Sequence, residues 1–150
     1  MFRGQFQHSV DAKGRISLPA RFREAVAGTD GAQPFVLTPA LFDPCLHLYP
    51  LPAWEEFEAK VAQLPSMDPH IVRFRRLYVS AAVECELDKA GRVLVPNHLR
   101  EKACLDKDVL WAGMGHHLEL WSKERWDQAL LITPEEEASF KQAVLEQIRI

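Results

Sequence analysis

One nine-residue segment occurs twice in this chain, and this repetition constrains the fold more than any other sequence feature. Residues 11–19 read Asp-Ala-Lys-Gly-Arg-Ile-Ser-Leu-Pro, and residues 88–96 read Asp-Lys-Ala-Gly-Arg-Val-Leu-Val-Pro. Three further stretches match between the copies: 22–24 with 99–101, 45–49 with 117–121, and Trp54 with Trp126. Two copies are too few for a solenoid. The sequence therefore predicts two similar halves related by a pseudo-two-fold axis.

Both copies carry the same succession of strand and helix signals. Apolar positions alternate with polar ones at 6–10 and at 83–87, which is typical of half-buried strands. Gly14 and Gly91 can adopt positive φ, so each repeated segment is predicted to turn a hairpin. A proline that suits the first turn of a helix ends each segment. Each half should run strand, turn, strand, short helix, strand, strand, with the later strands at 35–37, 45–49, 109–111 and 117–121.

Longer helices are predicted after each half. Trp54, Phe57, Val61 and Leu64 form an apolar stripe, and a second helix should follow at about 70–78. Thr133 and Glu136 form a capping box that begins a C-terminal helix. The apolar stripe of this last helix should pack on its own domain or on a sister subunit; it comprises Phe140, Val144, Leu145 and Ile148. The expected division is 5–51 for the first repeat, 52–80 for a helical connection, 81–123 for the second repeat, and 124–150 for a helical tail.

The net charge of the chain and the distribution of charge along it favour different classes of protein. The 150 residues carry 18 Lys and Arg against 21 Asp and Glu, a net charge of −3, which disfavours a simple basic nucleic-acid binder. Residues 1–23, however, contain five basic residues and one acidic residue. No apolar run approaches the roughly 20 residues of a membrane span. The first residues also lack a signal-peptide pattern, so no membrane association is expected.

Motifs for catalysis or metal binding are absent from the sequence. Cys45, Cys85 and Cys104 are widely spaced, so they are expected to be reduced, buried thiols. His116-His117-Leu118-Glu119 is not a zinc motif, and neighbouring side chains on a strand point to opposite faces. No phosphate-binding or nucleophile motif occurs. The four tryptophans could stack on single-stranded bases, but the matched pair Trp54 and Trp126 favours packing. We expect no enzymatic activity, cofactor or metal.

The repeated Asp-x-x-x-Arg pattern carries the most functional information. An aspartate entering a turn can accept hydrogen bonds from backbone N–H groups two residues on. An arginine leaving the turn presents a planar fork of donors that suits phosphate or a guanine edge. A purely structural ion pair within each loop is the alternative. Duplication favours function, since two loops offer two equivalent contacts.

Several motifs together resemble the MraZ family over nearly the whole chain. They are Met-Phe-Arg-Gly at 1–4, the two Asp-x-x-Gly-Arg turns, Pro-Cys-Leu-His-Leu-Tyr-Pro-Leu-Pro at 44–52 and Ser-Met-Asp-Pro at 66–69. The resemblance implies a mostly β, α+β fold of two tandem SpoVT/AbrB-type swapped-hairpin halves, forming a pseudo-two-fold β-barrel with flanking helices. It also implies a cytoplasmic, nucleoid-associated transcriptional regulator. Such a regulator would bind repeated DNA boxes upstream of its own division and cell-wall operon as a ring homo-oligomer.

The resemblance also implies which residues contact double-stranded DNA. They are Asp11, Arg15, Asp88 and Arg92, with Lys13 and Lys89 in support. Arg15 is the best candidate for reading bases, whereas Lys13, Arg3 and either Arg21 or Arg23 would hold phosphates. The two lysines stand at different loop positions, so their roles need not be equivalent. A ring-forming scaffold that binds other proteins, with basic loops that do not read DNA, is the competing hypothesis.

Overall fold

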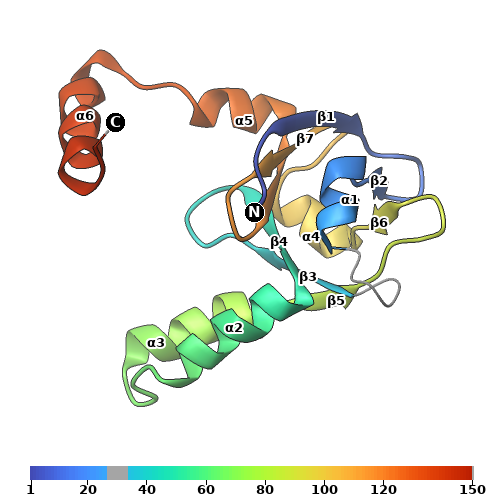
Figure 1. The fold of residues 1–150 in the computed structure, drawn as a ribbon, viewed down its shortest axis with the longest axis horizontal. Helices are drawn as coiled ribbons and strands as arrows, with labels where there is room; N and C mark the ends of the chain where they lie inside the picture. The colour runs from blue at the N-terminus through green and yellow to red at the C-terminus, as the bar shows by residue number, and fades with distance from the viewer. Residues whose placement is uncertain (27–33, 150) are drawn as a thin grey trace.

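The computed structural model describes residues 1–26 and 34–149 (Figure 1). The predicted long connection around 28–32 lies outside these residues. The fold is α+β with mainly antiparallel strands. The first half contains, in order, β1 (Gln5–Ser9), β2 (Arg15–Ser17), α1 (Ala20–Val26), β3 (Phe35–Pro39), β4 (Cys45–Pro50), α2 (Leu51–Ala62), α3 (Pro69–Phe74) and the π-helix η1 (Arg75–Val79). The second half contains β5 (Val83–Cys85), β6 (Arg92–Leu94), α4 (Asn97–Lys102), β7 (Asp108–Gly113), β8 (Leu118–Ser122), α5 (Lys123–Ala129) and α6 (Pro134–Gln147).

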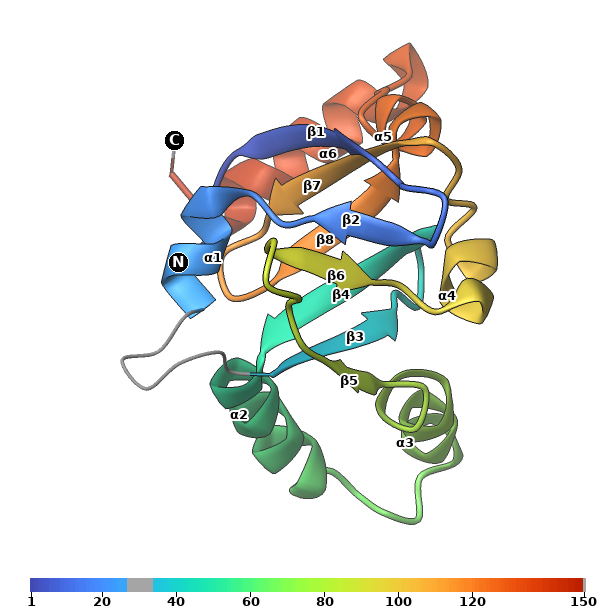
Figure 2. The ribbon, with the colours of Figure 1, turned by 90° about the vertical axis from the view of Figure 1, so that its right-hand side faces the viewer.

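Strands from the two halves are interleaved rather than folded into separate sheets. The large sheet has the order β1-β7-β8-β4-β3-β5, so each half supplies three of its six strands. Exchanging every strand with its counterpart in the other half reproduces this order in reverse. A pseudo-two-fold axis therefore passes between β4 and β8. The remaining strands, β2 and β6, pair antiparallel in a ribbon that lies across the sheet (Figure 2).

The main core lies between this ribbon and the inner face of the sheet. Ile16 and Val93 are opposite one another in the ribbon, and both are completely buried. Trp111 of β7 is also fully buried and donates a hydrogen bond from Nε1 to the carbonyl of Ser17, at 3.0 Å. Helices α1 and α4 close the core through Phe22 and Leu99. The ribbon is thus fixed to the sheet by apolar packing and one tertiary hydrogen bond.

Two expectations about the strands need correction. The turns form as predicted, but the strands on either side of each turn do not pair with each other, so the predicted hairpins are wrong. Instead β1 pairs with β7 and β2 pairs with β6, in both cases across the repeats. Local pairing in the second copy amounts to one bridge between Leu87 and Val93. The closed barrel is not confirmed, because β1 and β5 are the two edges of an open sheet in the part of the chain described. Pairing across the halves allows both short strands to bury their apolar side chains over one shared core.

Aromatic residues cover the outer face of the sheet. Trp54 and Tyr78, from α2 and η1, pack with Tyr49 of β4. Trp126 of α5 packs against Trp121 with ring centroids 5.8 Å apart. All four tryptophans are at most 8% exposed, so packing is confirmed and the single-strand stacking interpretation is wrong.

The predicted helices form, with small differences at their ends. Helix α2 stops at Ala62, before Leu64, which is 39% exposed. The capping box at Thr133 begins α6 as predicted. None of the helices in the described ranges is long and apolar enough to cross a membrane.

The cysteine prediction is only partly correct. All three cysteines are free thiols, and Cys45 is buried while Cys85 is half-buried. Cys104 is exposed, contrary to expectation. It adopts a left-handed φ of 55° just after α4, where the chain leaves the helix at the surface.

The ribbon offers a direct test of the core. We expect Ile16→Ala to lower the free energy of unfolding by about 2–5 kcal/mol, because it leaves a cavity beneath the ribbon. The control is Leu94→Ala in the other ribbon strand, where the side chain is 56% exposed. This change should alter stability by less than about 0.5 kcal/mol. Urea unfolding followed by tryptophan fluorescence measures both values, and equal effects would contradict the packing described.

Candidate nucleic-acid interface

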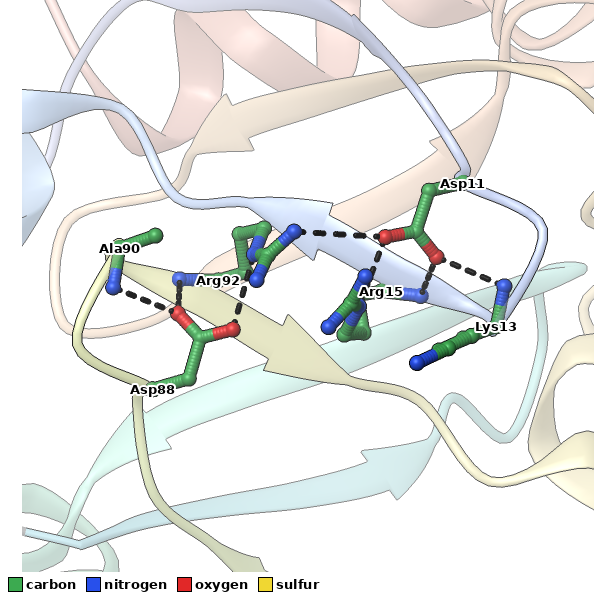
Figure 3. A network of polar contacts seen from close by, with 6 residues as sticks. All are labelled: Asp11, Lys13, Arg15, Asp88, Ala90 and Arg92. Carbon is green, nitrogen blue, oxygen red and sulfur yellow. Dashed lines mark hydrogen bonds and ion pairs between the residues drawn. The ribbon is translucent and has the colours of Figure 1, made fainter.

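The first turn is organised around the carboxylate of Asp11 (Figure 3). Its Oδ1 accepts hydrogen bonds from the backbone N–H groups of Lys13 and Arg15, each at 2.9 Å. Its Oδ2 accepts from Nε of Arg15 at 2.7 Å. The turn is closed by a backbone hydrogen bond from Gly14 to the carbonyl of Asp11. One carboxylate therefore shapes the loop and orients its arginine.

The second turn repeats this geometry. Oδ1 of Asp88 accepts from the backbone N–H groups of Ala90 and Arg92 at 2.9 Å, and Oδ2 accepts from Nε of Arg92 at 2.8 Å. Nη1 of Arg92 also lies 3.7 Å from Oδ2 of Asp11, which links the two turns. Figure 3 shows the two arginines between the two aspartates, above the ribbon. The structural ion pair considered from the sequence is present in both turns.

These ion pairs leave hydrogen-bond donors on both guanidinium groups, more on Arg15 than on Arg92, whose Nη1 is also near Asp11. The aspartates engage Nε, and among the described residues the terminal nitrogens of Arg15 have no hydrogen-bonded partner. The side chains of Arg15 and Arg92 remain 28% and 33% exposed. Because Ile16 and Val93 point into the core, the neighbouring ribbon positions face outward. The arginines are therefore oriented at the surface with donors still available.

An arginine from the other repeat lies close against the glycine of each turn. Gly14 and Gly91 have φ values of 82° and 78°, a left-handed conformation that favours glycine. A Cβ on Gly14 would lie 1.9 Å from Nη1 of Arg100 in α4, and one on Gly91 would lie 2.2 Å from Nη1 of Arg23 in α1. The glycines therefore also allow close approach of these arginines. Sequence reasoning missed Arg100, although the match between 22–24 and 99–101 contained the signal.

The remaining basic residues that the sequence predicts to contact DNA do not all lie on the turns. Lys13 and Lys89 are both exposed on the turns. The backbone position that Lys13 holds beside Asp11 is taken by Ala90 in the second turn, so the lysines are indeed not equivalent. Arg3 lies at the opposite end of β1 from Asp11 and lines a surface hollow with Arg21 beside α1. The structure does not bring Arg3 to the first turn.

Hydrogen bonding shifts the acidity of both aspartates. The backbone N–H of Arg15, and then its guanidinium, lower the pKa of Asp11 to about 2. The backbone N–H of Arg92 is the main cause that lowers the pKa of Asp88. Both carboxylates are therefore charged at neutral pH, which keeps both turns fixed.

A second polar cluster lies at the pseudo-two-fold axis on the outer face of the sheet. Cys45, His47 and Glu119 have ligand-type atoms within 4.8 Å of one another. His47 already contacts the hydroxyl of Tyr78 at 2.7 Å and Glu119 at 3.3 Å, and Glu119 accepts from Trp121 at 3.0 Å. Burial raises the pKa of Cys45 above its ordinary range, which disfavours the thiolate that a metal requires. The cluster is best explained as a hydrogen-bonded link between β4 and β8.

His117, the residue just before β8, belongs to the same packed region. Its ring stacks on Tyr49 with centroids 5.1 Å apart. Burial, followed by the nearby His47, lowers the pKa of His117 to about 4. The residue is therefore neutral at pH 7 and acts in packing, whereas His116 is exposed.

Fold and site together define a class of protein: two interleaved β-rich repeats that display a pair of Asp–Arg turns on one ribbon. Comparison with known protein families agrees with the division of the chain into two repeats. The family model described as "MraZ protein, putative antitoxin-like" matches residues 1–77 and again residues 78–147. The chain belongs to the MraZ family.

Its relatives match over most of their length. A protein of Desulforamulus reducens is 45% identical over 142 residues, which cover 95% of this chain and 94% of that protein. Proteins of Heliobacterium modesticaldum and Caldanaerobacter subterraneus are 46% and 44% identical over 128 residues, which cover 85% of each chain. All three are named "Transcriptional regulator MraZ".

The glycine conformation can be tested by substitution. Gly14→Ala should destabilise the fold by at least about 1–2 kcal/mol, because φ is left-handed and the new Cβ meets Arg100. The double variant Gly14→Ala/Arg100→Ala should recover only the part of the lost stability that comes from contact between the new Cβ and Arg100. Denaturant unfolding of both variants separates the two contributions, and an unchanged stability for Gly14→Ala would contradict the turn geometry.

The low pKa of Asp11 gives a second test. Its folded pKa of about 2 lies below the unfolded value of about 3.9, so its stabilising contribution is complete above pH 4 and is lost as pH falls towards 2. Asp11→Asn lacks this contribution. The stability difference between wild type and variant should therefore be constant from pH 7 to 5 and shrink between pH 4 and 2. If denaturant titrations gave a stability difference between wild type and Asp11→Asn that did not change with pH, the low pKa of Asp11 would be contradicted.

Proposed function

We propose that this chain is a sequence-specific DNA-binding regulator of transcription that reads double-stranded DNA with its two Asp–Arg turns. The names of its relatives support the general function. The particular mechanism rests on one observation: both arginines are held through Nε on the outer face of a two-stranded ribbon.

The shape of the ribbon supports an approach to the major groove. That groove admits a two-stranded antiparallel ribbon, and guanine presents two acceptors there that suit a guanidinium fork. Arg15 offers both terminal nitrogens in this way without reorganisation, because Asp11 already fixes its side chain through Nε. Arg92 is fixed by Asp88 in the same way, but its Nη1 would have to leave Asp11 to form a two-donor contact. A side chain ordered before binding loses less entropy on binding.

Different basic residues would serve different roles. Arg15 and Arg92 would contact base edges, with Asp11 and Asp88 as positioning residues. Lys13 and Lys89 would contact phosphates, as would Arg3, at the other end of β1. Phosphate contacts fix register but carry no sequence information.

Net charge argues that one chain binds weakly. The chain as a whole is negative, so few phosphates can be neutralised by each copy. Several copies in a ring homo-oligomer could contact repeated boxes together, and linked contacts raise avidity. The expected boxes lie upstream of the protein's own operon, in the division and cell-wall gene cluster. Such a protein would work in the cytoplasm, associated with the nucleoid, without catalysis or a cofactor.

The arginine mechanism predicts a defined loss of binding. Arg15→Lys keeps the charge but removes the planar fork. Because a bidentate base contact contributes about 1–3 kcal/mol, affinity for the upstream DNA should fall roughly 5- to 150-fold, with little change for unrelated DNA. Fluorescence anisotropy at two salt concentrations measures both affinities.

Matched variants make the result specific. Arg92→Lys tests the second turn in the same way. Arg125→Lys, on an exposed position of α5, is the control and should bind like wild type. Wild-type binding by both turn variants would overturn the mechanism and favour the protein-binding scaffold instead.

A further inference from the structure

Helix α6 is separated from the rest of the molecule. In Figure 1 it lies beyond α5, away from the sheet. None of its residues is buried, and Phe140 and Leu145 are 51% and 60% exposed. The segment that leads to it is also apolar and exposed, at Leu130, Leu131 and Ile132. An isolated 14-residue helix is marginal in water, and contiguous exposed apolar surface marks an interaction site.

The other half shows how the equivalent helix is covered. Each half ends in two helices, α2 then α3–η1 in the first and α5 then α6 in the second, and the last helix begins at Asp68-Pro69 or Thr133-Pro134. The first-half helix packs through Phe74 and Tyr78, four residues apart, onto α2 and the sheet. Phe140 and Val144 have the same spacing in α6, but in the described part of the chain Phe140 is 51% exposed and Val144 is only half-buried.

A groove of complementary character lies between α2 and α3–η1. Its volume is about 620 Å³. Its apolar lining comprises Val61, Ala62, Val72 and Val79, and its charged lining comprises Glu58, Arg75 and Arg76. Glu136 and Glu137 lie one helical turn before Phe140, on the same side of α6. The groove therefore combines an apolar floor with two arginines and one glutamate, and the helix combines an apolar stripe with acidic neighbours.

We propose that α6 of one copy binds the groove between α2 and α3–η1 of a second copy. The helix and the groove belong to opposite halves of the molecule, so the contact is head to tail. Each chain then offers one helix and one groove, and repetition of the contact produces a closed ring if the rotation between copies permits closure. This inference rests on the proposed function: the contact between α6 and the groove would be the interface that joins neighbouring copies in the ring.

Single charged substitutions test each side of the junction. Phe140→Glu should abolish docking of the helix, and Ala62→Glu should block the groove. Both positions are exposed in the single chain, so folding should be preserved. The controls add the same charge nearby: Ser139→Glu on another side of α6, and Ala59→Glu on α2 outside the groove lining. Light scattering after size exclusion should give the mass of one chain for both test variants and the wild-type oligomer for both controls.

Mixing the two test variants distinguishes this arrangement from others. Phe140→Glu retains an intact groove, and Ala62→Glu retains an intact helix. Together they should form a two-chain complex with a single junction, detected over a concentration series by sedimentation. The proposal is overturned if wild type is a single chain, if either test variant keeps the wild-type mass, or if the mixture stays dissociated.

The result is independent of DNA binding. All masses are measured without DNA, so loss of the DNA mechanism would leave them unchanged. Conversely, the turns of Phe140→Glu are intact. It should retain the wild-type preference for the upstream DNA while losing affinity for several boxes in tandem.

Discussion

The antiparallel pairing of β2 with β6 is the interaction on which the rest of this structure depends. It brings one short strand from each repeat together, buries Ile16 and Val93 over a common core, and places both turns on the same surface. Neither strand could do this alone, because three residues form too little ladder and too little apolar area. The two halves are therefore a single folding unit, although their sequences repeat.

Electrostatics at the turns follows from the same arrangement. Each aspartate uses one oxygen to hold backbone N–H groups and the other to hold Nε of its arginine. Stability of the loop and orientation of the guanidinium thus come from the same carboxylate. A chain with net charge −3 can present oriented positive groups in this way without a basic surface overall.

Much of the local structure could be predicted from the sequence, because it depends on local chemistry. Alternation gave the strands, glycine and aspartate gave the turns, and Thr133 with Glu136 gave the start of α6. The Asp–Arg pairing within each turn was also predictable, since duplication made the pattern conspicuous. The close approach of Arg100 to Gly14 was not, because the two residues come from different repeats and lie 86 positions apart in the chain.

The sequence by itself determined that there are two like halves, each with an Asp–Arg turn, because repeated residues with the same local hydrogen-bonding capacity adopt the same local form. Only the tertiary structure decided which strands pair. Pairing across the repeats replaced the expected hairpins, left β1 and β5 as open edges where a barrel was expected, and left α6 uncovered. Strand pairing depends on how much apolar surface the whole chain buries when it folds. A local sequence pattern does not specify this total, so it does not specify which strands pair.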